Sequence, residues 1–344
     1  REGDTDPRYI LPNKGGSAVN LAFSPDGTTL IAGSQNHISR WRVDSEPPEP
    51  IDFLAAHVGD LYDVGFAPDG ETLAITTDNG VCYVWETASG SLRYTLTNNR
   101  HNVTGLMYTP DGDLVVGSLA SETQLWLGSS GQLRFASENE DIFAYVYDVA
   151  VSADNNWIAA ARDYGSILIL NRQTGEQVQI LTGHRDIVRA VTFFPRTDIT
   201  LLASSGDDGV INLWQLNGDA FELLASYDDA TNSINALASD GAYLVAGDNN
   251  GIIWRYYLET TADAENVVPE TLTVNGGVVS LAVAPGDGQL LAVGTNNGQI
   301  EIIHLAEART VLTLPWGGTV AFSPDGTLLA AASRAGLRVW AVRP

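Results

Sequence analysis

Cysteine, methionine and lysine are nearly absent from the sequence. Cys82 is the single cysteine, which excludes an internal disulfide bond and a cysteine-based metal site. Lys14 is the one lysine among 18 basic residues, and this preference for arginine hints at a bacterial source. No apolar run approaches the roughly 20 residues that a membrane helix needs, so we expect no membrane insertion.

The start of the sequence lacks both a Met and a visible signal peptide. The first residue is Arg, so we expect a processed or excised product. Two compartments stay open for it: the cytoplasm, or an exported location if a leader was removed.

Basic side chains are scarce relative to acidic ones. The chain has 42 acidic and 18 basic residues, for a formal net charge of −24. A negative field of this size repels phosphate backbones and anionic membrane surfaces, which argues against nucleic acid and lipid partners. We expect a soluble monomer whose protein or peptide partners are basic.

The motifs that usually accompany catalysis are missing as well. The sequence has no Gly-Lys-Ser/Thr for a P-loop, no His-Glu-x-x-His and no Gly-x-Ser-x-Gly elbow. Acid pairs such as Asp207-Asp208 lack the alternating frame of an EF-hand. We therefore expect no catalytic residue, no cofactor and no metal.

A repeated turn motif organises the chain. Copies related to Ser-Pro-Asp-Gly recur about every 43 residues, which divides the chain into eight units. The copies are Ser24–Gly27, Ala67–Gly70, Thr109–Gly112, Ser152–Asn155, Phe194–Thr197, Ala238–Gly241, Ala284–Asp287 and Ser323–Gly326.

Each unit reads as four short strands. Pro and Gly suit the tight turn between the first two strands, and Asn-Gly or Asp-Gly dipeptides predict a two-residue hairpin between the second and third. The third strand carries a large side chain at a fixed place, which we interpret as a packing site between neighbouring units. These side chains are Trp41, Trp85, Trp126, Leu170, Trp214, Tyr256, Ile303 and Trp340.

This pattern resembles the WD40 repeat (WD-repeat) family, and the fifth unit resembles it most. There, Gly183-His184 precedes the first strand, Asp208 lies in the second turn and Trp214 in the third strand. The resemblance implies a buried hydrogen-bond network of His184, Ser204, Asp208 and Trp214. It also implies an all-β fold, a closed eight-bladed β-propeller of four-stranded antiparallel blades, with seven blades as the alternative.

The two ends of the chain are expected to meet. The last unit supplies three strands, and the N-terminal strand at about residues 9–12 has no unit of its own. Pairing the two would complete the last blade and remove exposed sheet edges. We therefore predict a single WD-repeat propeller domain over residues 1–344.

The leading functional hypothesis is a non-enzymatic scaffold that binds protein or peptide partners on one face. Two alternatives stay open: an enzyme or a small-ligand or metal-binding propeller with its site in the central channel, and a sensor or receptor module of a larger protein. Large or charged loop residues are the candidate contacts, because aromatic residues and Arg dominate binding hot spots. The candidates are Phe143, Tyr145, Arg162, Tyr164, Arg185, Trp316 and Arg334.

Overall fold

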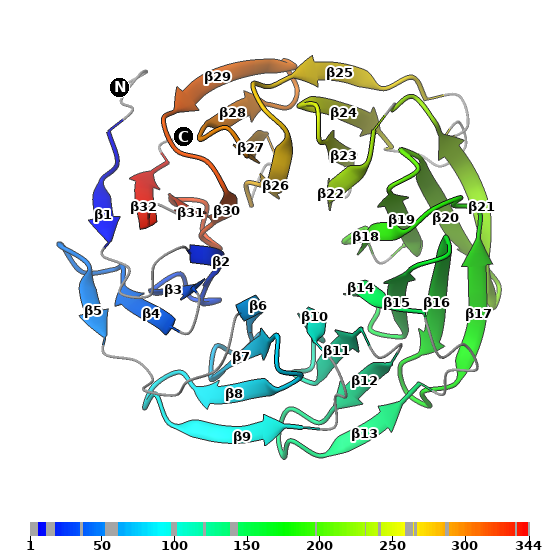
Figure 1. The fold of residues 1–344 in the computed structure, drawn as a ribbon, viewed down its shortest axis with the longest axis horizontal. Coiled ribbons are helices and arrows are strands. Elements are labelled where there is room, and N and C mark those ends of the chain that lie inside the picture. The colour runs from blue at the N-terminus through cyan, green and yellow to red at the C-terminus, as the bar shows by residue number, and fades with distance from the viewer. Residues whose placement is uncertain are drawn as a thin grey trace. The chain divides into compact units, whose positions relative to one another are not determined.

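The computed structural model is all-β in its regular structure. It describes residues 6–11, 18–34, 37–51, 61–97, 102–119, 122–137, 144–196, 198–230, 232–239, 242–258, 264, 267–285, 289–333 and 336–342. Within these residues, 32 strands form eight four-stranded antiparallel sheets (Figure 1). The predicted eight-bladed β-propeller is confirmed, and the seven-bladed alternative is wrong.

Every sheet uses its strands in chain order, except that β1 completes the last sheet. The first strands are β2 (Ala18–Phe23), β6 (Leu61–Phe66), β10 (Val103–Tyr108), β14 (Val146–Val151), β18 (Val188–Phe193), β22 (Ile234–Ser239), β26 (Val278–Val283) and β30 (Thr319–Phe322). The second strands are β3 (Thr29–Ser34), β7 (Thr72–Thr77), β11 (Leu114–Ser118), β15 (Trp157–Arg162), β19 (Leu201–Gly206), β23 (Tyr243–Asp248), β27 (Leu290–Thr295) and β31 (Leu328–Ser333).

The third and fourth strands complete the sheets. The third strands are β4 (His37–Arg42), β8 (Cys82–Glu86), β12 (Thr123–Trp126), β16 (Ser166–Asn171), β20 (Ile211–Asn217), β24 (Ile252–Tyr257), β28 (Ile300–His304) and β32 (Gly336–Ala341). The fourth strands are β5 (Glu49–Ile51), β9 (Leu92–Leu96), β13 (Leu133–Ala136), β17 (Gln177–Thr182), β21 (Ala220–Tyr227), β25 (Glu270–Thr273), β29 (Arg309–Leu314) and, for the last sheet, β1 (Tyr9–Leu11).

The repeated Pro-Asp-Gly motif forms the first turn of a sheet as its chemistry requires. In the first copy, the Gly27 N–H donates to the Ser24 carbonyl at 2.8 Å, and Gly27 takes a φ of +70° that residues with a Cβ rarely adopt. The Asp26 carboxylate accepts a hydrogen bond from the Thr28 N–H at 3.0 Å. Turn chemistry in the sequence therefore sets the period of the fold.

The second turns differ from the two-residue hairpin that the Asn-Gly dipeptides predict. At Thr77–Gly80 the Gly80 N–H bonds the Thr77 carbonyl at 3.3 Å, and only Gly80 has positive φ. A two-residue type I′ turn needs positive φ at both central residues. That geometry occurs instead in the fourth sheet, at Tyr164 (φ 57°) and Gly165 (φ 68°).

The large side chains of the third strands are buried, each at most 7% exposed. Six of them share an apolar cluster with residues of the preceding sheet in the same unit: Trp41, Trp85, Leu170, Trp214, Tyr256 and Trp340. Trp85 of β8 clusters with Ile31 and Ile38 of β3 and β4, and Trp214 of β20 clusters with Ile167 of β16. The column thus buries apolar surface between blades, because a single four-stranded sheet cannot bury both of its faces alone.

The chain divides into two compact units, residues 1–97 with 274–344 (unit 1) and residues 98–273 (unit 2). Within unit 1, β1 pairs antiparallel with β32, placing Tyr9 opposite Val339 and Leu11 opposite Leu337. The first and last described strands of the chain therefore share one sheet (Figure 1). That residues 1–344 fold as a single domain stays a prediction.

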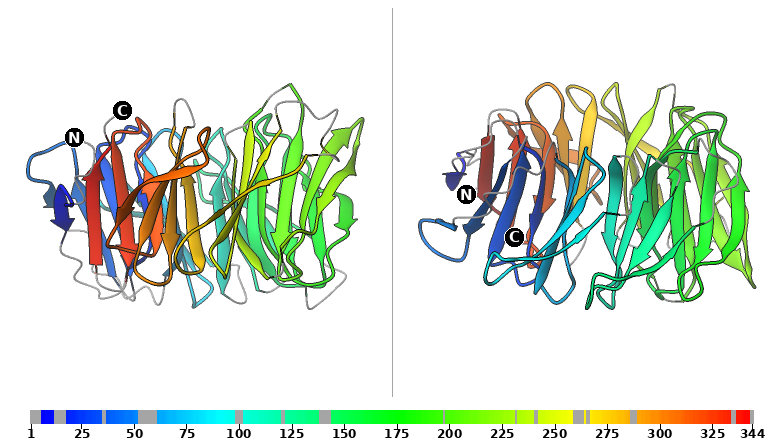
Figure 2. Two further views of the ribbon diagram at one scale, coloured as in Figure 1. Left: turned by 90° about the horizontal axis from the view of Figure 1, so that it is seen from above. Right: turned by 60° about the horizontal axis from the view of Figure 1, so that its bottom comes forward.

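Unit 2 contains the sheets that begin with β10, β14, β18 and β22. These first strands lie side by side along the chain order, and the strands run between two faces of the unit, where the loops gather (Figure 2). The loops that lead into the first strands share one face with the turns between second and third strands. Phe193, Leu202 and Trp214 lie in the apolar cluster that holds the central blades of unit 2 together.

Candidate functional site

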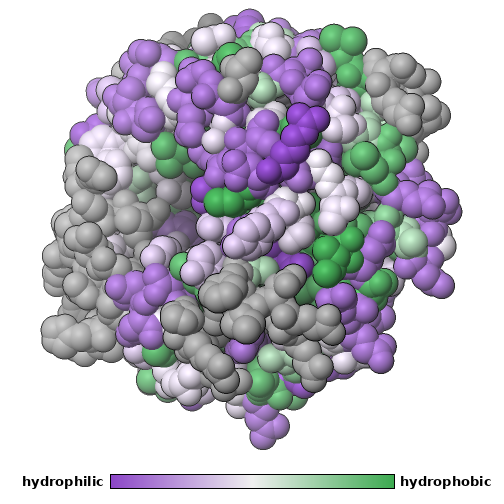
Figure 3. Space-filling model, turned by 45° about the vertical axis from the view of Figure 1, so that its right-hand side comes forward, coloured by the Kyte–Doolittle hydropathy of each residue, from purple (hydrophilic) through white to green (hydrophobic). Residues whose placement is uncertain are grey.

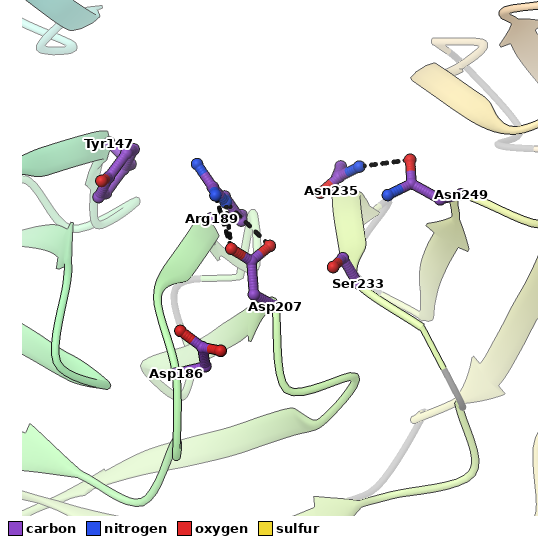
Figure 4. Close-up of a pocket in the computed structure, with 7 residues that line it drawn as sticks. All are labelled: Tyr147, Asp186, Arg189, Asp207, Ser233, Asn235 and Asn249. Atoms are coloured by element: carbon purple, nitrogen blue, oxygen red, sulfur yellow. Dashed lines mark hydrogen bonds and ion pairs between the residues drawn. The ribbon is translucent and has the colours of Figure 1, made fainter.

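Three β-bulges in unit 2 aim side chains into one pocket. In β14, β18 and β22 the pairing register shifts around the second residue of the strand, which is Tyr147, Arg189 and Asn235 respectively. A bulge bends the strand and redirects the extra side chain. These three residues line a pocket of about 790 Å³ (Figure 4). The other lining residues come from adjoining loops and turns: Asp186, Asp207, Ser233 and Asn249.

One wall of the pocket is an ion pair stacked on a ring. The Arg189 Nε lies 3.0 Å from both Asp207 carboxylate oxygens, and Nη2 lies 2.5 Å from Oδ2. The guanidinium also lies over the Tyr147 ring, 4.8 Å from its centre. The hydrogen bond to Asp207 raises the pKa of Arg189, and burial raises the pKa of the Tyr147 hydroxyl. Arg189 and Asp207 therefore largely neutralise each other.

An amide pair forms the opposite wall. Asn235 donates from Nδ2 to Oδ1 of Asn249 at 2.8 Å, and Ser233 lies beside them (Figure 4). Asn235 is the second residue of its first strand, as Arg189 is in the preceding blade. Asn249 directly follows its second strand, as Asp207 does. The site is thus built from equivalent positions of neighbouring blades filled by different polar groups.

Three of the residues predicted to contact partners are exposed on the same face of unit 2. Tyr145 precedes β14 and is 41% exposed, Tyr164 in the β15–β16 turn is 79% exposed, and Arg185 before β18 is also exposed. The Asp163 N–H bonds the Tyr145 carbonyl at 3.2 Å, which joins the first two loops. We refer to Tyr145, Tyr164, Arg185 and the pocket together as the unit 2 surface.

Arg162 does not belong to this surface. It is the last residue of β15, lies opposite Val146 in register and is only 3% exposed. The adjacent type I′ turn projects Tyr164 outward while Arg162 stays below it in the sheet. A side chain this buried cannot act as an exposed contact, so the prediction for Arg162 is corrected.

The three remaining predicted contacts are not counted in the unit 2 surface. Phe143 and Arg334 lie outside the described residues. Trp316 belongs to unit 1, is partly buried, and has the Arg338 guanidinium 4.0 Å from its ring centre. One face of the Trp316 ring is thus covered within its own blade.

The fifth blade brings together the four side chains of the predicted network. His184 Nδ1 lies 3.1 Å from both Asp208 carboxylate oxygens, and its Nε2 lies 2.9 Å from the Ser204 hydroxyl. Trp214 donates from Nε1 to the same hydroxyl at 3.0 Å. With the ring proton on Nδ1, every one of these buried polar groups has a partner.

This network also holds the loop that borders the pocket. Asp208 accepts a hydrogen bond from the Arg185 N–H at 2.9 Å. Burial acts to raise the pKa of Asp208, but the hydrogen bonds from His184 and the Arg185 N–H outweigh it and hold the pKa below its usual value. The ionised carboxylate therefore anchors the backbone from which Arg185 and Asp186 project.

The described residues offer no metal site and no membrane helix. No three His, Cys, Asp or Glu side chains among them gather closely enough to hold an ion. No helix in the described part of the chain has the length and apolar character needed to span a bilayer. On the face drawn in Figure 3, apolar side chains form small groups separated by polar ones.

Comparison with known proteins identifies the repeat. The family profile "WD domain, G-beta repeat" matches residues 6–42, 48–86, 175–215 and 318–341, which fall on blades of the structure. The chain belongs to the WD40-repeat β-propeller family. WD40 propellers commonly act as protein-interaction scaffolds and are typically non-catalytic.

Sequence relatives of this WD40 propeller are distant. Apoptotic protease-activating factor 1 of Rattus norvegicus is 22% identical over 90% of this chain and 28% of its own length. An uncharacterized WD repeat-containing protein of Synechocystis is 31% identical, over 44% of this chain and 56% of its own length. Target of rapamycin complex subunit wat1 of Schizosaccharomyces pombe is 23% identical over 60% of this chain and 67% of its own.

These relatives limit what can be transferred. The chain spans 28% and 56% of the length of the first two. A match to a cyanobacterial protein does not establish the source of this chain, so the bacterial source stays a prediction. The crystal structure of the computationally designed Ika8 protein aligns with a TM-score of 0.80 at 17% identity, over 97% of this chain and 98% of that one. At this identity the likeness shows the fold alone.

The WD40 pattern in the sequence did not reveal the pocket residues Arg189, Asn235 and Asn249. The sequence contains only a weak indication that these residues line a site. Arg189 and Asn235 are polar residues at the second position of otherwise apolar first strands, and Asn249 is one more turn residue. Only the bulges show that this position turns toward the pocket.

Proposed function

We propose that this propeller is a non-enzymatic scaffold that binds a peptide segment of a protein partner at the unit 2 surface. The observation that supports this most is the polar pocket with exposed Tyr145, Tyr164 and Arg185 on the same face. Small-molecule sites are lined mostly by apolar side chains. This pocket has one ring and six polar residues, which suits a partner's backbone and polar side chains better.

The pocket lining also lacks the arrangement that activates a nucleophile. Ser233 supplies a hydroxyl, but the described lining contains no His to serve as its base. Arg189 and Asp207 are bound to each other. These groups can donate and accept hydrogen bonds to a bound segment without reacting with it.

Charge favours a basic partner. The net charge of −24 speeds the approach of positively charged proteins and slows that of nucleic acids. One relative is named as a subunit of a complex, which fits a role in assembly.

Selection of random peptides displayed on phage against the immobilised intact chain tests this proposal. We expect peptides that bind the wild-type chain and lose at least about tenfold in affinity for a Tyr145→Ala, Tyr164→Ala, Arg185→Ala variant. The matched control is Val178→Ala, Ile180→Ala, Leu223→Ala, which removes three exposed apolar side chains from β17 and β21. If the peptides lost affinity only for the control variant, they would bind at β17 and β21, and the proposal would be refuted.

A further inference from the structure

The charges that line the pocket do not balance. Asp207 is paired with Arg189, but the Asp186 carboxylate has no cation bonded to it among the described residues. Asp186 Oδ1 accepts the N–H of Ile187 at 2.8 Å, and the residue is exposed. The pocket therefore carries an excess negative charge that is accessible from solvent.

The ion pair makes an anionic ligand unfavourable. A carboxylate from a partner could reach Arg189 only by competing with the hydrogen bonds that Asp207 already makes to Nε and Nη2. Asp186 requires no such exchange to bind a cation. Arg189 itself occupies the position against the Asp207 carboxylate and the Tyr147 ring, so Asp186 is the carboxylate left for a partner's cation.

Tyr164 is an independent sign of a ligand. It is the one aromatic residue with positive φ in the described chain, and it is 79% exposed. A left-handed backbone is unfavourable for a residue with a Cβ, and such strain concentrates at functional sites. An exposed ring at the end of the blade that supplies Tyr147 can stack on a cation or on the stem of a basic side chain.

The amide pair can bind a peptide backbone. The Asn235 side chain donates from Nδ2 to Oδ1 of the Asn249 side chain. The other half of each side-chain amide, Oδ1 of Asn235 and Nδ2 of Asn249, can therefore bond a ligand. One acceptor and one donor side by side match the N–H and C=O of a peptide unit.

We infer that the pocket binds a Lys or Arg side chain of the partner's peptide segment, with the Asp186 carboxylate as its counter-ion and Asn235 and Asn249 on the peptide backbone. This inference rests on the proposed function. It narrows that function from peptide binding in general to recognition of one basic residue.

Peptides selected as above provide the probes, and fluorescence anisotropy on the intact chain gives their dissociation constants. We expect the selected peptides to share a Lys or Arg at one position. Changing that residue to Gln should weaken binding to the wild-type chain about tenfold. The same change in the peptide should alter its affinity for the Asp186→Asn variant by less than about twofold, because this variant already lacks the carboxylate that pairs with the basic residue.

Asp219→Asn is the matched control. Asp219 is exposed in the β20–β21 turn, at the opposite end of β20 from Asp207, and its loss changes the net charge equally. In the Asp219→Asn variant, changing the peptide's basic residue to Gln should still weaken binding about tenfold. If this effect were reduced equally in Asp186→Asn and Asp219→Asn, the preference for a basic residue would come from the net charge of the protein, and the inference would be overturned. Selected peptides that need Tyr164 but share no basic residue would overturn it while the proposed function stands. A library yielding no peptide that depends on the unit 2 surface would overturn both.

Discussion

The Asp148 carboxylate of β14 accepts a hydrogen bond from the backbone N–H of Val191 in β18, 3.0 Å away in the next blade. Its other oxygen accepts the Val149 N–H at 2.9 Å. Asp63 plays a similar part in unit 1, where it accepts a hydrogen bond from the Asn20 side chain at 2.6 Å. Polar residues next to the bulges thus bind one blade to its neighbour.

Asp148 should make stability depend on pH. Burial raises its pKa from 3.8 to about 6, against the opposing effect of the two backbone hydrogen bonds. Because the folded state disfavours the ionised form, stability should fall by on the order of 1–3 kcal/mol as pH rises from about 4 to 7. Thermal melts of the wild-type chain across this range should show the decline, and Asp148→Asn should flatten it.

The exposed Asp219→Asn variant controls for the loss of one charge and should keep the wild-type slope between pH 4 and 7. Asp208 and Asp325 have lowered pKa values, so the stability they contribute is lost only at more acidic pH. An Asp148→Asn variant with the full wild-type slope would show that other groups cause it.

The pairing of β1 with β32 should contribute strongly to stability. Leu11 is 5% exposed in a cluster with Leu21 and Leu337, whereas Ile10 is 67% exposed. Leu11→Ala should lower the free energy of unfolding by about 2–4 kcal/mol, and Ile10→Ala by less than about 0.5 kcal/mol. Deleting residues 1–11 should lower the melting temperature further. Unchanged chemical denaturation curves for Leu11→Ala and the deletion would contradict this.

Ser204 should stabilise both the fifth blade and its loop. Ser204→Ala leaves His184 Nε2 and Trp214 Nε1 buried without their partner and should cost about 1–3 kcal/mol. Denaturant titration measures this cost, and selected peptides should also bind more weakly because the Arg185 loop is less firmly held. Ser226→Ala, at an exposed position of β21, should change neither property. Equal behaviour of the two variants would argue against the network.

Tyr164 should increase peptide affinity while lowering the stability of the fold. Asn tolerates a left-handed backbone more readily than Tyr, so Tyr164→Asn should raise the free energy of unfolding by about 0.5–1 kcal/mol. The same variant should lose peptide affinity. Tyr145→Asn, where φ is not positive, should show no gain in stability. A destabilised Tyr164→Asn would mean that the ring packs on the protein instead of serving a partner.

The repeat, the strands and the blade count could be predicted from local features. Pro and Asp at positions such as Pro25 and Asp26, followed by a Gly with positive φ, specify a turn regardless of the rest of the chain. The Trp41 column follows from the same logic, since one large side chain at a fixed strand position needs a neighbouring blade to cover it.

The site itself depends on the tertiary structure. Arg162 and Tyr164 are two residues apart in the sequence, yet Arg162 is buried at the end of β15 and Tyr164 is 79% exposed, because Tyr164 lies in the type I′ turn that follows the strand. Arg189 reaches the pocket only because β18 bulges against β19, and Asp207 meets it from 18 residues away. The sequence by itself determined the repeating blade, because turn chemistry and alternating burial act locally. Only the pairing register and the contacts between blades decided which side chains share a pocket.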